Sequence, residues 1–143
     1  MKVFVDTNVL LYRFDRDSPK KQQVAKAELR RLILERAIVL STQVLQEFYV
    51  AATRKLKQPL EPERAAAVVD YLVRLPLLQI GAVTVQRAIA LHREHSISFW
   101  DALIVQTAIA AGADLLYSED LQSGQQFEGV TVVDPFTAVQ RRG

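Results

Sequence analysis

The 143-residue chain contains no cysteine, which excludes disulfide bonds, thiolate metal sites and cysteine nucleophiles. It also lacks a hydrophobic run long enough to cross a membrane, because polar residues such as Gln106 and Thr107 interrupt the longest apolar stretch. The N-terminus has no signal-peptide pattern, since an acid at position 6 and Arg13 flank its short apolar run. Together these absences predict a cytoplasmic location.

Internal repeats, low-complexity tracts and interdomain linkers are missing as well, so one domain spanning residues 1–143 is expected. The formal net charge of +2 is too small to indicate a polyanionic partner by itself. Basic residues nevertheless cluster in one segment, which indicates either a solvated helix face or a surface for phosphates or an acidic partner. The cluster consists of Lys20, Lys21, Lys26, Arg30, Arg31 and Arg36.

Short apolar segments rich in β-branched residues alternate with longer segments of helical periodicity. Strands are predicted at residues 2–5, 37–40, 77–80, 115–117 and 130–133. Helices are predicted at residues 20–35, 43–56, 62–74, 84–95 and 98–111. This alternation is typical of an α/β fold with a central, mostly parallel sheet. In such sheets, ligands bind beyond the carboxyl ends of the strands.

The segment VFVDTNVLLY at residues 3–12 places three polar residues between two stretches that belong in a core. Burial of an unpaired carboxylate is costly, so Asp6 must cap a helix, pair with a cation or bind a metal. Asp6 directly follows the first predicted strand, which places it at the carboxyl edge of the sheet. The simplest alternative to metal binding is an N-cap for a helix that starts near Thr7.

A second acid breaks an apolar pattern in the predicted helix 43–56. Glu47 shares one helix face with Val44 and Phe48, which are core-type residues. No cation lies within one helical turn of Glu47, so its partner must come from elsewhere in the fold. The alternative is a position at the helix edge that faces water.

Two further acids lie near element ends. Asp101 falls in the first turn of a strongly apolar helix, where Ser98 precedes it in a capping-box-like pattern. Asp120 follows the predicted strand 115–117, where an ordinary polar loop is the alternative. Capping does not exclude a second role, because a carboxylate at a buried helix start can also face a cleft.

Each acid has a simple explanation alone, but all four fall at the same rim of a parallel sheet. Carboxylates that converge there repel one another unless a divalent cation neutralises them. Oxygen ligands suit Mg²⁺ or Mn²⁺ better than Zn²⁺, and such a cluster can activate water for in-line attack on a phosphodiester. The predicted cluster comprises Asp6, Glu47, Asp101 and Asp120, with Asn8 and Ser118 as neutral hydrogen-bonding partners.

Four segments, in this order along the chain, resemble the signatures of a PIN-domain ribonuclease. They are VDTNVLL at 5–11, STQVLQEF at 41–48, FWDALI at 99–104 and LLYSEDL at 115–121. The resemblance spans nearly the whole chain, and the compact size is similar to that of the VapC toxins of bacterial toxin–antitoxin pairs. It implies a three-layer α/β/α fold and a Mg²⁺- or Mn²⁺-dependent endoribonuclease that hydrolyses RNA phosphodiester bonds.

The resemblance also implies roles for individual residues and for partners. Asp6, Glu47, Asp101 and Asp120 would form the catalytic, metal-binding acid cluster, and Asn8 and Ser118 would support Asp6 and the metal site. Glu119 is an open alternative to Asp120 as the fourth acid, although Ser118-x-Asp120 fits the family's hydroxyl-x-acid pattern better. Such toxins generally form homodimers and are inhibited by a VapB-type antitoxin whose tail occupies the groove.

Rival functions remain open at this point. They are a housekeeping PIN nuclease in RNA processing, a metal-dependent phosphatase, and a catalytically silent PIN-like binding module. The phosphatase lacks support from a D-x-D pattern, because Thr7 and Asn8 follow Asp6. Phe99 and Trp100 are predicted to pack in the core rather than to stack on bases, because the helix that follows them is apolar almost all round.

Overall fold

Short strands and longer helices alternate along residues 1–137, the part of the chain that the computed structural model describes. In chain order the elements are β1 (Val3–Val5), α1 (Thr7–Tyr12), α2 (Pro19–Leu34), β2 (Ile38–Ser41), α3 (Thr42–Arg54), α4 (Pro62–Leu72), β3 (Leu77–Leu78), α5 (Ala82–Glu94), α6 (Phe99–Ala110), β4 (Leu115–Tyr117), β5 (Gln126–Phe127) and β6 (Val130–Val133). The predicted domain extends to residue 143, so residues 138–143 lie outside the described part of the chain.

The sheet has the strand order β3-β2-β1-β4-β6-β5. All pairs are parallel except β5 with β6, which is antiparallel. Strands β1 and β2 are buried along their whole length, as expected for parallel strands that are covered on both faces. The predicted α/β class with a mostly parallel central sheet is therefore confirmed.

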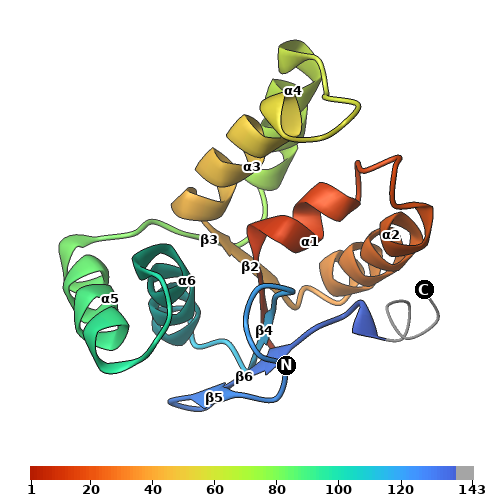
Figure 1. The fold of residues 1–143 in the computed structure, drawn as a ribbon. Helices are drawn as coiled ribbons and strands as arrows, with labels where there is room; N and C mark the ends of the chain where they lie inside the picture. The colour runs from red at the N-terminus through yellow and green to blue at the C-terminus, as the bar shows by residue number, and fades with distance from the viewer. Residues whose placement is uncertain (138–143) are drawn as a thin grey trace.

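Helices cover the sheet from two sides, which gives the three layers that were predicted. Helices α1 and α2 lie on one side, and α5 and α6 lie on the other (Figure 1). Helices α3 and α4 pack against each other and project beyond the edge of the sheet (Figure 1). No helix within residues 1–137 combines the length and the apolar character that crossing a membrane requires.

The structure also contains features that the sequence pattern did not predict. Strand β5 pairs with β6 through a tight turn in which Glu128 and Gly129 both have positive φ, at 45° and 87°. Two residues with positive φ are typical of the turns that match the twist of a hairpin. The strand predicted at 77–80 is limited to Leu77–Leu78.

Phe48 packs the projecting pair of helices, α3 and α4, against the core of the protein, and its replacement tests this packing. Phe48 is 0% exposed, and its ring centroid lies 5.6 Å from that of Phe14. We expect Phe48→Ala to lower the free energy of unfolding by roughly 3–5 kcal/mol, because it leaves a cavity in the core. Urea denaturation measures this loss. The neighbouring Tyr49→Ala removes a side chain that is 39% exposed and should cost about 1 kcal/mol or less. Equal losses at the two positions would contradict this packing.

Candidate active site

Asp6 connects β1 to α1 and holds a buried carboxylate at the carboxyl edge of the sheet. The residue is 4% exposed. Its Oδ1 accepts a hydrogen bond of 2.7 Å from the Thr7 N–H, which makes Asp6 the N-cap of α1. Its Oδ2 accepts bonds of 2.8 Å from the Ser118 hydroxyl and 3.3 Å from Asn8 Nδ2. Asn8 and Ser118 thus contact Asp6 as predicted, and all these donors are neutral.

Asn8 joins the start of α1 to the loop that follows β4. Its Nδ2 donates to Asp120 Oδ2 at 3.0 Å, and its Oδ1 accepts from the Glu119 N–H at 3.2 Å. The Asp120 N–H in turn donates to Ser118 Oγ at 3.2 Å. Because β4 lies next to β1 in the sheet, these bonds keep Asp120 close to Asp6.

Glu47 reaches the site from α3. Its Oε1 accepts a 2.8 Å hydrogen bond from Thr7 Oγ1, and its Oε2 accepts a longer bond of 3.4 Å from Gln43 Nε2. The expectation that Glu47 finds its partner elsewhere in the fold is therefore confirmed, and that partner is Thr7. Thr7 carries no charge, so the negative charge of Glu47 is not neutralised by this contact.

Gln43 is a site residue that the sequence analysis missed. It is 4% exposed, and its Nε2 also donates to the Trp100 carbonyl oxygen at 3.3 Å. Its Oε1 is buried and has no hydrogen-bond partner within the described residues. Orphaned buried acceptors are rare in native proteins. The available signal was a glutamine one helical turn before Glu47 on the inward face of α3.

Asp101 lies in the first turn of α6, where its N–H donates to Ser98 Oγ at 3.0 Å. The predicted N-cap at Ser98 is thus confirmed. Ser98 also hydrogen-bonds to the Asp101 carboxyl and lowers its pKa, but no cation pairs with that carboxyl within the described residues. Its side chain lines the pocket that contains the other acids.

One pocket of about 480 Å³ is lined by all four predicted acids. They come from the end of β1, from α3, from the start of α6 and from the loop after β4. As the side chains stand in residues 1–137, no group of three or more histidine, aspartate or glutamate residues is close enough to hold a metal ion. Hydrogen bonds to Asn8 and Thr7 hold Asp120 and Glu47 in their own positions. The assignment of the acids as metal ligands stays a prediction.

The pocket carries an excess of negative charge. Burial raises the pKa of the Asp6 carboxyl from 3.8 to about 7, against the lowering effect of the bonds from Ser118 and Thr7. The charges of Asp120 and Glu47 contribute to this rise. Burial likewise raises the pKa of Asp101, and Asp120 and Glu47 contribute to this rise. Within the described part of the chain, no lysine, arginine or histidine forms an ion pair with any of the four acids.

This donor set fits a hard divalent cation such as Mg²⁺ or Mn²⁺. Carboxylate and amide oxygens are the ligands that these ions prefer, whereas Zn²⁺ favours nitrogen and sulfur. The uncompensated charge of the acids would be satisfied by such a cation.

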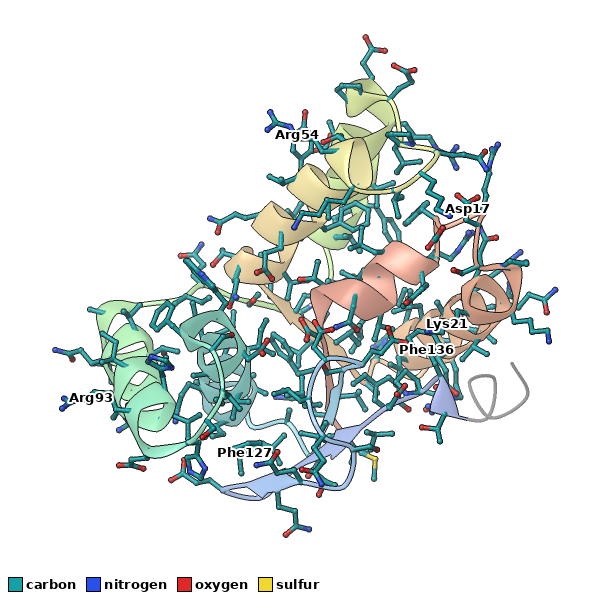
Figure 2. The ribbon with its side chains drawn as sticks, viewed as in Figure 1. Asp17, Lys21, Arg54, Arg93, Phe127 and Phe136 are labelled. Atoms are coloured by element: carbon teal, nitrogen blue, oxygen red, sulfur yellow. The ribbon has the colours of Figure 1, made fainter. Side chains whose placement is uncertain are left out.

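Glu119, the alternative fourth acid, is directed away from the other carboxylates. Its Oε2 lies 2.6 Å from Lys21 Nζ on α2, and its Oε1 accepts a 2.8 Å bond from the Tyr12 hydroxyl. Lys21 Nζ also lies 4.8 Å from the Tyr12 ring centroid and 5.8 Å from that of Phe136. Figure 2 shows Lys21 and Phe136 next to each other beside α2. Glu119 thus anchors the loop to α1 and α2, which favours Asp120 as the acid that faces the pocket.

The prediction that Trp100 packs in the core is wrong. Trp100 is 61% exposed and lines the pocket beside Asp101, whereas Phe99 is partly buried against the core. The apolar pattern of α6 applies from its second turn onward, where the sheet and α5 cover the helix. Its first turn extends past the carboxyl edge of the sheet, and the indole there is left uncovered.

Replacement of Asp6 by asparagine tests the buried charge. Because the pKa of Asp6 is raised, the folded protein holds this proton more tightly than the unfolded chain does. Protonation of Asp6 therefore stabilises the folded protein. This contribution to the free energy of unfolding is complete below about pH 4 and is lost as the pH rises through about 7. In EDTA we therefore expect Asp6→Asn, which keeps the N-cap acceptor, to gain stability relative to the wild type as the pH rises from 5 to 8, by at most about 3 kcal/mol.

Thermal and urea unfolding at the two pH values measure this difference. Asp70→Asn is the matched control, because Asp70 is exposed on α4 and its replacement should leave the pH profile of the wild type unchanged. Parallel stability profiles for the wild type and Asp6→Asn would show that the Asp6 carboxyl is not perturbed by burial.

Comparison with known proteins agrees with this fold. The sequence model of the PIN domain matches residues 3–124. No curated protein sequence matches the chain significantly. A toxin–antitoxin complex from Klebsiella pneumoniae is similar in structure, with a TM-score of 0.66 and 22% identity over 94% of this chain and 98% of the other.

Two further solved structures show the same likeness. DNA-bound VapBC from Salmonella typhimurium has a TM-score of 0.66 and 20% identity, over 94% of this chain and 98% of the other. The sarcin–ricin-loop-cleaving toxin VapC20 from Mycobacterium tuberculosis has a TM-score of 0.62 and 21% identity, over 83% and 90%. At these identities the similarity to solved structures shows a shared fold. The family assignment rests on the sequence model of the PIN domain, which matches most of the chain. The chain belongs to the PIN domain family.

Proposed function

We propose that this protein is a divalent-metal-dependent endoribonuclease that hydrolyses phosphodiester bonds of RNA, and that it is the toxin of a VapBC-type toxin–antitoxin pair. The observation that carries the proposal is the convergence of four carboxylates, from four separate segments, on one pocket of about 480 Å³. Membership of the PIN domain family and the likeness to solved toxin–antitoxin structures support it.

In this proposal Asp6, Asp101 and Asp120 hold a Mg²⁺ or Mn²⁺ ion, and Glu47 completes the acid cluster. When bound, such an ion lowers the pKa of water and stabilises the negative charge that builds up on a phosphate during in-line attack. The protein's own contribution is to place the acids around one site. Ser118 and Thr7 fix the Asp6 carboxylate, and Asn8 lies between Asp6 and Asp120.

Glu47 is suited to move a proton in this reaction. Its Oε1 is held by Thr7, while its Oε2 makes only a 3.4 Å contact with Gln43, and the residue lines the pocket. An acceptor in this position can take a proton from a water molecule that attacks the phosphorus.

A polynucleotide suits the pocket better than a small phosphate ester does. The wall that α3 contributes continues from Glu47 through Val50 to Lys55, an exposed residue that follows the end of the helix. A positive charge about two helical turns from the acids can bind a phosphate that flanks the scissile one. A small ester has no such second phosphate.

A separate groove offers a place for an antitoxin. It measures about 620 Å³ and lies between α2 and α4, with an apolar floor that includes Leu29, Ile33 and Val68. Lys26 and Arg30 of the basic segment line the same groove. Apolar residues surrounded by basic ones suit a protein segment with apolar and acidic side chains. The antitoxin partner and a homodimeric state are both parts of this proposal.

Cleavage of a mixed cellular RNA pool tests the nuclease directly. The wild type should cleave with Mg²⁺ or Mn²⁺ and stop in EDTA, and Asp6→Asn should be slower by on the order of a hundredfold or more. Asp70→Asn, which changes an exposed acid on α4, should cleave like the wild type. Cleavage by Asp6→Asn at the wild-type rate would refute the role of the acid cluster. Growth arrest on induced expression in bacteria, absent for Asp6→Asn, would separate a toxin from a housekeeping nuclease.

Metal affinity decides between Asp120 and Glu119. Titration calorimetry with Mn²⁺ should show that Asp120→Asn weakens binding by about tenfold or more, because it removes a charged ligand. Glu119→Gln should change the affinity much less, because Glu119 bonds to Lys21 and Tyr12 instead of facing the pocket. A larger loss for Glu119→Gln than for Asp120→Asn would reverse this assignment.

A further inference from the structure

We propose that Trp100 is the residue on which a base of single-stranded RNA stacks while the neighbouring phosphodiester lies at the acid cluster. The proposal rests on the function proposed above and adds to it how the substrate is held. Trp100 is 61% exposed, directly precedes Asp101 in the chain and lines the pocket that contains all four acids.

The exposure of this side chain is unusual for its helix. Seven consecutive residues of α6, from Ala102 to Ala108, are buried, and the sequence of α6 is the most apolar among the described helices. A large indole left in water at the start of such a helix forgoes the stabilisation that burial would provide. An exposed indole at the edge of a pocket that holds four carboxylates offers an apolar face to a ligand that binds there.

The indole is also held in a defined orientation. The Phe99 ring meets it edge to face, with centroids 5.1 Å apart and planes at 74°. The Trp100 carbonyl oxygen accepts a hydrogen bond from Gln43 Nε2, which fixes the backbone that carries the ring. A side chain that is already ordered loses little conformational entropy when a base stacks on it. This arrangement therefore favours stacking over transient contact.

The positions of the surrounding charges determine how a strand would lie. Trp100 forms the α6 wall of the pocket, and Gln46, Val50 and Lys55 lie on the α3 wall. A strand that stacks one base on the indole can place the adjacent phosphate among the acids and a flanking phosphate near Lys55. Stacking on a side chain requires a base that is not paired within a duplex, so the ligand is single-stranded or looped RNA.

Trp100 is the only tryptophan of the chain, so its fluorescence reports on this contact without a label. The wild type would be titrated, in Mg²⁺, with a mixed-sequence RNA oligonucleotide that is 2′-O-methylated throughout to prevent cleavage. We expect saturable quenching of the emission. Anisotropy of the labelled oligonucleotide should show that Trp100→Ala loses between about fivefold and a hundredfold in affinity, while Trp100→Phe retains most of it.

Two controls separate stacking from a loss of structure. Tyr49→Ala removes another exposed aromatic side chain, on α3 and outside the pocket, and should bind the oligonucleotide like the wild type. Thermal unfolding should place Trp100→Ala close to the wild type, since most of the side chain that it removes is solvent-exposed. In cleavage assays the Trp100→Ala defect should appear mainly in KM, because the acids that serve the chemical step are unchanged.

Unchanged emission on RNA addition, together with wild-type affinity of Trp100→Ala, would overturn the proposal. It would also be overturned if the emission changed with protein concentration alone and Trp100→Ala turned a dimer into a monomer, because the indole would then belong to an interface between copies. Metal-dependent cleavage with a wild-type KM in Trp100→Ala would refute stacking and leave the nuclease intact. Quenching by RNA without cleavage would support stacking and count against the nuclease.

Discussion

A carboxylate that is buried without a cation organises this protein. Asp6 lies where β1 ends and α1 begins, and its two oxygens are occupied by Thr7, Ser118 and Asn8. Those donors come from the first turn of α1 and from the end of β4, so the charge can be accommodated only if β1, β4 and α1 meet correctly. Neutral hydrogen bonds offset part of the desolvation cost but leave the pKa raised. The fold thus maintains a position that is electrostatically unfavourable in the absence of a cation.

From Asp6, hydrogen bonds extend to the remaining walls of the pocket. The Thr7 hydroxyl donates a hydrogen bond to Glu47 on α3. Gln43, also on α3, contacts both Glu47 and the backbone of Trp100. Helices α1, α3 and α6 are connected in this way by side chains that carry no positive charge. Such a network positions carboxylates without neutralising them, which preserves their capacity to bind a cation.

Much of the architecture could be predicted from local sequence patterns. Alternation of short apolar strands with helices indicated the parallel sheet, and the rule that carboxyl ends of parallel strands share one edge indicated that Asp6 and Asp120 meet. Strand β5 could not be predicted, because two residues are too few to show a period. The exposure of Trp100 was also inaccessible, since it depends on where the sheet ends relative to the first turn of α6.

The contact between Lys21 and Glu119 links positions 98 residues apart, and no local sequence pattern predicts it. It has a consequence for how related sequences can diverge. If Lys21 is lost alone, Glu119 loses the ammonium group that lies 2.6 Å from its Oε2. If Glu119 is lost alone, Lys21 leaves an ammonium group between Tyr12 and Phe136 without its carboxylate. Substitutions at the two positions should therefore be correlated among homologues, with both charges kept or both replaced.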